Sequence, residues 1–503
     1  MIPPRNPAER RRHSCRNSLA ALLCLMLASC AAGPDFVRPA APPVAEYTLR
    51  DLPGSTVDAD GEAQVFVRGT HPRQDWWRGF RSPEIDDMVD QAMKGNATLS
   101  AAEASLRQSQ DSLRAGYGIF FPQAELAFTG TRERTAPLTQ GLAGPGSIFN
   151  VFTLSGSVVY AIDLFGGQRR TLEGLQARRD NARFEAEAAR LTLQANLVET
   201  AIARAGYASQ MDAMTTMLQL QSVVLYQTEV QAKAGVLGFV NVAAVRSQMA
   251  ITAAQLALLK QKYEQAGHLL VNLQGDFAGR LALPPLDLDT ISLPRDLPVS
   301  LPSDLVRRRP DILAAEARLH AASADVGVAS AALFPAILLS GDIGKAGESL
   351  HSLSGAGAKF WGGGAEVDAP LFRGGSLWFG RKAAVEAYNN AADSYRQTVL
   401  DSFTQVADVL KALEHDAEAV KAQSIIVASA EDVRDLVWAN YNAGLVSAIE
   451  VLNAEIQVEQ ADINYTAAVA QRYQDTVALF AAIGGGWQNE DESARRRASR
   501  GAP

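Results

Sequence analysis

The chain has 503 residues, of which 47% are hydrophobic, 7% are aromatic and 20% are charged. This balance suits long helices better than a β-sandwich or a disordered chain, and the length is ample for more than one domain core. The net charge of -8 shows no bias toward nucleic acid, so we expect no nucleic-acid partner.

A secretion signal is predicted at the N-terminus. Five arginines precede a short apolar run that ends in Leu27-Ala28-Ser29-Cys30, which is the pattern of a cleaved signal peptide, and the run is too short to span a bilayer. The last four residues resemble a bacterial lipobox, so we predict a signal peptide at residues 1–29 and an N-acyl diglyceride on Cys30, with no other cofactor. Cys15 and Cys24 lie in the removed segment, so no disulfide is available. The alternative is a buried cysteine in an ordinary signal peptide.

The remaining chain is a duplication, with an offset of about 210 residues between its halves. Leu164-Phe165 followed by Gly166-Gly167 matches Leu371-Phe372 followed by Gly374-Gly375, and Ala234-Gly235 matches Ala443-Gly444. We predict an extended leader at 30–75, a first repeat at 76–280, a Pro-rich linker at 281–302, a second repeat at 303–487 and a disordered tail at 488–503.

Each half is predicted to contain a helix, two strands, a very long helix and a further helix. Apolar residues recur at alternating steps of four and three along Phe184–Ala205 and along Val399–Val420, which indicates helices packed on neighbouring helices. No proline interrupts Gly167–Ala234, and a helix of roughly 65 residues would be about 100 Å long. Such a helix must lie in a bundle or a tube. A plain coiled-coil rod fits the same pattern.

Four strands are predicted from alternating apolar and polar residues, at about 122–132, 150–164, 335–345 and 360–371. Runs of about ten residues with one apolar face fit transmembrane β-strands. A soluble, half-buried sheet gives the same alternation. An exported, lipid-anchored chain without a predicted transmembrane helix favours the membrane interpretation.

Four strands require partner chains if they lie in a membrane. Each unpaired backbone group costs several kcal/mol in hydrocarbon, and the smallest bacterial barrel has about eight strands. Two copies reach that number and three give twelve strands with a wider lumen. Geometry therefore predicts an oligomer and leaves the number of copies open.

Several motifs resemble the outer membrane efflux protein family, the TolC-like outer membrane factors, and in particular the lipoprotein branch of OprM and NodT type. They are Gly33–Pro39 after Cys30, Trp76-Trp77, Asp163–Gly166, Arg309–Ile312 and Gly484–Trp487. The resemblance implies a mainly α fold with a small transmembrane β part. Three copies would form a homotrimer with a twelve-stranded β-barrel in outer-membrane lipid and an α-barrel of long periplasmic coiled-coil helices. A periplasmic adaptor (membrane fusion protein) would couple this duct to an inner-membrane pump.

Two sets of site residues follow from the resemblance. Polar strand faces would line the lumen, with the acids Asp163, Glu366 and Asp368 among them. The reversals of the long helices would be the adaptor-contacting tips, at Gly235 and Val236 in the first repeat and at Gly444 and Leu445 in the second. Glycine also suits a helix end, so simple helix capping is the alternative for the tips.

A periplasmic entrance ring is expected at Glu450 and Asn453. In the family, acidic residues follow the second turn; Glu450 keeps the charge, whereas Asn453 departs from the usual aspartate, which puts a second ring in doubt. Charged rings select ions in pores, although a solvated helix glutamate is the alternative for Glu450.

The predicted function is a passive exit duct in the cell outer membrane for small molecules such as drugs and toxic compounds. The alternatives are a duct for type I polypeptide secretion and a lipid-anchored envelope scaffold without a pore. An enzyme is not expected, because the six histidines are scattered without an HExxH pair and no usable thiol remains. The sequence names neither the transported compounds nor the pump.

Overall fold

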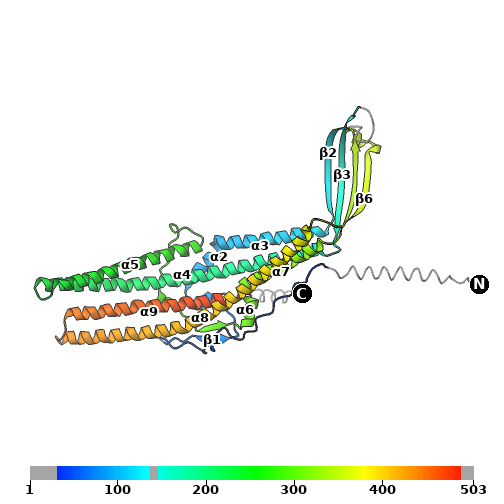
Figure 1. The fold of residues 1–503 in the computed structure, drawn as a ribbon. Helices are drawn as coiled ribbons and strands as arrows, with labels where there is room; N and C mark the ends of the chain where they lie inside the picture. Colours follow the sequence, from blue (N-terminus) through cyan, green and yellow to red (C-terminus); the bar gives the residue numbers. More distant parts are fainter. Residues whose placement is uncertain (1–30, 60, 136–144, 489–503) are drawn as a thin grey trace, which may run out of the picture. The chain divides into compact units, whose positions relative to one another are not determined.

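The computed structural model describes residues 31–59, 61–135 and 145–488 (Figure 1). The chain divides into two compact units. One contains residues 107–181 and 316–394 with the chain up to Arg38, and the other contains residues 39–106 and 182–315 with the chain from Tyr395 onward. Helices dominate both repeats, which confirms the mainly α class.

Equal helix lengths mark the duplication. In the first repeat α3 (Ala97–Gly116) is followed by α4 (Gly167–Lys233) and α5 (Phe239–Leu273), and the second repeat has α7 (Pro310–Ala331), α8 (Ser376–Asn442) and α9 (Ala448–Ala482). Helices α4 and α8 have 67 residues each, and α5 and α9 have 35 each. The shorter elements are α2 (Pro83–Gly95), α6 (Pro302–Arg308), η1 (Trp76–Phe80), η2 (Tyr117–Phe120), η4 (Leu288–Thr290), η5 (Ser352–Ser354) and η6 (Ala356–Ala358).

The predicted strands form one antiparallel sheet in the order β2-β3-β5-β6. They are β2 (Gln123–Arg134), β3 (Ile148–Ile162), β5 (Ala336–Gly347) and β6 (Lys359–Asp368). Each strand lies within a few residues of its predicted range, and Figure 1 shows them side by side. Within the described residues, the outer edges of β2 and β6 pair with no further strand.

A second, smaller sheet was not predicted. β1 (Val65–Arg68) of the leader pairs in parallel with β4 (Asp296–Val299) of the linker. The prolines of the linker argued against regular structure, but Pro298 lies in β4, where a two-stranded sheet leaves one edge free of ladder hydrogen bonds. Phe66, Leu297 and Val299 are buried in the core beside α8. The leader is therefore extended, as predicted, and is also fastened to the linker.

The heptad positions form much of the core. Val198 and Ile202 of α4 are fully buried in one cluster, and Val406, Leu410 and Leu413 of α8 are buried in another together with residues of α9. Each such aliphatic side chain contributes about 1.5–3 kcal/mol by leaving water. The first heptad positions of α4 contribute less to the core, because Phe184, Ala188 and Leu191 are only partly buried.

No transmembrane helix was predicted, but helix α5 has the length and composition of one. Among the described residues it alone is long and apolar enough to span a membrane. Such a helix is weak evidence for a span, because apolar helices that pack on other helices pass the same test. α5 lies along α4, where Arg246 pairs with Glu229 at 2.8 Å and Gln221 donates to Thr252 at 3.1 Å.

Candidate functional site

The register of the sheet assigns its residues to two faces. Leu126, Gly156, Ile343 and Trp361 are direct cross-strand neighbours in one row, and directly opposite residues share a face. The same face carries Phe128, Leu154, Val158, Leu339, Ile337 and Val367. Leu126 is 79% exposed and Trp361 is 83% exposed. The chain alone therefore leaves an apolar sheet face uncovered.

The opposite face is polar and acidic. Its carboxylates are Glu125, Glu133, Asp342, Glu366 and Asp368, and the described strands place no cation on it. Glu366 and Asp368 were predicted there. Glu125 and Asp342 occupy one cross-strand row, separated by Ser157. Sequence reasoning missed them, although the same alternation runs through the weaker strands that contain them.

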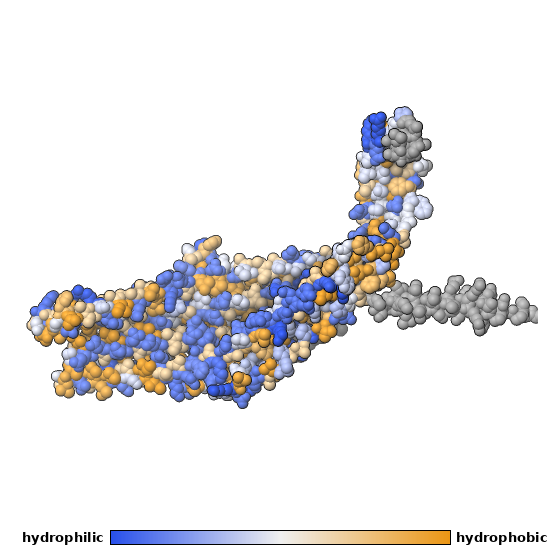
Figure 2. Space-filling model, in the orientation of Figure 1, coloured by the Kyte–Doolittle hydropathy of each residue, from blue (hydrophilic) through white to orange (hydrophobic). Residues whose placement is uncertain are grey.

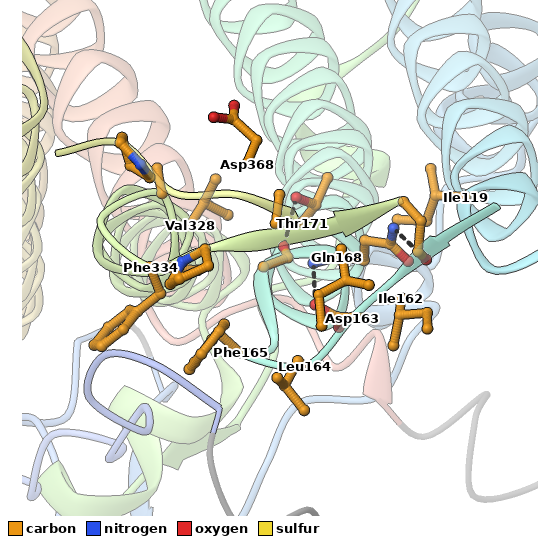
Figure 3. Close-up of a pocket in the computed structure, with 18 of the residues that line it drawn as sticks. Ile119, Ile162, Asp163, Leu164, Phe165, Gln168, Thr171, Val328, Phe334 and Asp368 are labelled. Atoms are coloured by element: carbon orange, nitrogen blue, oxygen red, sulfur yellow. Dashed lines mark hydrogen bonds between the residues drawn. The ribbon is translucent and has the colours of Figure 1, made fainter. Parts of the chain in front are cut away.

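Asp163 lies beyond the strand end, which is Ile162 and not residue 164 as predicted. Its carboxylate accepts a hydrogen bond from the backbone N–H of Gln168 at 3.1 Å (Figure 3). It also accepts one from the backbone N–H of Arg169 at 3.0 Å and pairs with the Arg169 guanidinium at 3.2 Å. Asp163 thus satisfies free amides at the start of α4. It lines a pocket of about 520 Å³ at the helix end of the sheet, together with apolar residues such as Phe165 and Phe334. The lumen-facing role of Asp163 stays a prediction, and in this chain its carboxylate binds the start of α4.

The leader is docked beside this pocket. The backbone N–H of Ala32 donates to the carbonyl of Phe165 at 2.8 Å. The side chain of Arg170 is only 6% exposed and binds the Asp35 carboxylate at 2.7 Å. Gly33 is packed so closely on Gly327 that an added Cβ would lie 2.6 Å from its Cα. Cys30 and the signal peptide lie outside the described residues, so the predicted lipidation stays a prediction.

The two helix reversals have matching geometry. Gly235 has a φ of 74° and Gly444 a φ of 77°, the left-handed conformation predicted for these glycines. The N–H of Val236 donates to the carbonyl of Gln231 at 3.0 Å, and that of Leu445 to Asn440 at 2.9 Å. Val236 and Leu445 are both strongly exposed. Each turn therefore presents an apolar side chain that its own repeat does not cover.

Glu450 and Asn453 lie on one face of α9. Glu450 is in the first turn of the helix, and both side chains are exposed. Gln457 and Gln460 continue this exposed face at the following turns. The structure thus brings the two predicted entrance residues together on one polar face of α9, and the entrance ring stays a prediction.

A carboxyl cluster between long helices was not predicted. Burial, followed by hydrogen bonding and repulsion from Asp475, raises the pKa of Asp416 on α8 to about 8. Burial and the same Asp475 on α9 raise the pKa of Glu199 on α4 to about 7. Burial lowers the pKa of the nearby Arg472. No local sequence signal marks these groups, because they meet only when the three helices pack.

Long duplicated helices that carry a four-stranded sheet with an uncovered apolar face define the class of outer-membrane channel subunits. The model of the family described as "Outer membrane efflux protein" matches residues 88–276 and 301–485. The chain belongs to this family. The match falls in two segments, and the predicted repeats at 76–280 and 303–487 stay a prediction.

Individual relatives agree with the family over most of their length. The pyoverdine export outer membrane protein OpmQ of Pseudomonas putida is 28% identical over 427 residues, 83% of this chain and 89% of the relative. A probable efflux pump outer membrane protein of the same species, TtgC, is 28% identical over 493 residues, 95% and 97% of the two chains. The solved outer-membrane channel OprN superposes with a TM-score of 0.79 at 27% identity, covering 91% of this chain and all of that one.

The chain is accordingly an outer-membrane channel component of a tripartite efflux system, located in the outer membrane and extending into the periplasm. Proteins of this family are transport ducts rather than enzymes. The expected absence of a cofactor stays a prediction.

Proposed function

We propose that the protein is a passive exit duct for small molecules, built from three copies whose sheets close into one twelve-stranded barrel. The observation that carries this proposal is the four-stranded sheet with an exposed apolar face, whose two edges pair with no further strand among residues 31–59, 61–135 and 145–488. In hydrocarbon such edges require partner strands, and four strands are too few for a barrel. Copies of the same chain supply the missing strands at the β2 and β6 edges.

The acidic sheet face would line the lumen of this barrel. Closing the sheet with its apolar side outward turns Glu125, Asp342, Glu366 and Asp368 inward. A wall of carboxylates attracts cations and repels anions. Glu450 and the neutral Asn453 would narrow the periplasmic entrance, and the charge of Glu450 would attract cations there as well.

The helix reversals would contact the periplasmic adaptor. Val236 and Leu445 project from turns of equal length that both repeats form with a left-handed glycine. Exposed apolar side chains on a rigid turn suit a partner that buries them. The adaptor would connect the duct to an inner-membrane pump, which supplies the energy.

The N-terminal lipid would hold the chain in the outer membrane. An acylated Cys30 would lie two residues before Ala32 and five before Asp35, which are fixed next to the end of β3. This docking would keep the acyl chains at the level where the strands meet the helices.

Planar-bilayer recording of the purified, lipidated protein tests the channel. We expect discrete conductance steps with a preference for cations. A protein that never forms such steps would instead favour the envelope scaffold. Restored efflux of a fluorescent small molecule in cells that lack their own outer-membrane duct would separate efflux from polypeptide secretion, whereas rescue of a secreted polypeptide alone would contradict the small-molecule proposal.

A further inference from the structure

The charges of the sheet are sorted by face without exception. All five carboxylates of the strands lie on the polar face, whereas Arg132, Arg134, Lys345 and Lys359 lie on the apolar face. The ladders contain no bulge, so the alternation holds along every strand. The apolar face thus carries four cations and no anion within the described strands.

The four cations lie at the loop ends of their strands, in two pairs. Lys345 and Lys359 share one cross-strand row with Leu154 and Phe128, whereas Arg132 and Arg134 lie four and six residues farther along β2. Arg132 and Arg134 are near the end of β2, Lys345 is near the end of β5, and Lys359 is the first residue of β6. All of these positions adjoin the hairpin loops and are remote from the helices. Figure 2 shows strongly hydrophilic residues at this end of the sheet. The apolar row with Leu126 and Trp361 lies nearer to the helices.

The arrangement leaves positive charge without a partner. Lys345 and Lys359 are direct cross-strand neighbours, and like charges in this position destabilise a sheet. In the described part of the chain, no carboxylate forms an ion pair with any of the four cations. Further copies of the chain cannot neutralise them, because every copy adds the same cations to the outward face. Glu348, directly after β5, is the first carboxylate that follows Lys345 along the chain, so most of this positive charge is left for anions of the surrounding lipid.

We infer that this basic end of the apolar face binds the phosphate groups of the phosphorylated glycolipid in the outer leaflet, the lipid A type. This inference rests on the proposed barrel, which places the loop end of the strands at the outer surface. Cations on a lipid-facing strand are tolerated at the interface and not in the hydrocarbon. Arginine and lysine are the residues that recognise phosphate, and basic clusters at membrane level bind anionic head groups.

Retention of lipid A by the purified full-length protein tests the inference. The protein in a mild non-ionic detergent would be mixed with bisphosphorylated lipid A or with lipid A whose phosphates have been removed, and bound lipid would be counted by native mass spectrometry. We expect the phosphorylated form to bind preferentially. The fourfold variant R132Q/R134Q/K345Q/K359Q should bind more weakly, by about fivefold for each cation removed.

Two further variants make the result decisive. E125Q/D342N changes the opposite face of the same strands and should bind lipid A as the natural chain does. K345Q/K359Q should be at least as heat-stable as the natural chain without lipid A, because it removes a repulsion. Equal binding by the fourfold variant, or equal binding of the phosphate-free lipid, would overturn the inference. Retention does not require conduction, so a chain that keeps lipid A but never conducts would refute only the duct.

Discussion

The side chain of Gln64 in the leader forms a buried hydrogen-bond network with the linker and α9, and the cost of breaking it can be calculated. The Gln64 side chain is 0% exposed. Its amide nitrogen donates to the carbonyl of Pro294 at 3.1 Å and to Thr476 at 3.0 Å, and its oxygen accepts from the Arg472 guanidinium at 3.0 Å. Gln64→Leu leaves the Pro294 carbonyl and one Arg472 N–H without partners. At about 1–3 kcal/mol for each buried group, the substitution should cost about 4 kcal/mol.

Hydrogen exchange of the leader measures this cost directly. The N–H of Val65 is protected by the carbonyl of Arg295 at 2.7 Å, so its exchange reports detachment of β1. A loss of about 4 kcal/mol corresponds to about a thousandfold faster exchange. Gln91→Leu is the matched control, because it makes the same change at an exposed position of α2. Unchanged exchange in Gln64→Leu, or equal exchange in both variants, would refute the reasoning.

Three further predictions concern the helices. Burial raises the pKa of Asp416 to about 8. Between about pH 4 and pH 8 its carboxyl is therefore protonated in the folded chain and ionised in the unfolded chain. Its contribution to the free energy of unfolding is complete below about pH 4 and is lost as the pH rises through about 8. The melting temperature should therefore fall over that range, and less steeply in Asp416→Asn; an equally steep fall would contradict this. Gly485 has a φ of 62° and an added Cβ would strike Leu191, so Gly485→Ala should lower the melting temperature by an amount worth about 2–4 kcal/mol. Leu191→Ala should recover part of that loss, and no recovery would argue against the clash. Glu450→Gln should lower the cation preference in bilayer recordings, and unchanged selectivity would remove Glu450 from the entrance.

The strands and long helices were predictable because their signals are periodic. Alternation located β3 and β6 to within a few residues, and heptads identified α8 residues such as Val406 and Leu413 as core. The end of β3 was missed, because Asp163 continues the alternation while its carboxylate already serves α4.

Features that depend on distant contacts were not predictable. The pairing of β1 with β4 joins segments more than 200 residues apart, and Pro298 argued against it locally. Likewise, the sorting of Glu125 and Lys345 onto opposite faces becomes visible only when the register between strands is known. Residues whose role requires three packed helices, such as Asp416 and Asp475, carry no local signal at all.

The matched spans of 67 and 35 residues in the two repeats restrict how this chain can change. Deleting a single residue from α4 would shorten that arm by about 1.5 Å and swing its far end by about 100° around the axis. The side chain of Val236 would then point in a different direction from that of Leu445, the equivalent residue of the second repeat. An insertion or deletion in α4 therefore needs an equivalent change in α8 for the two turns to stay level, whereas a substitution at an exposed position does not.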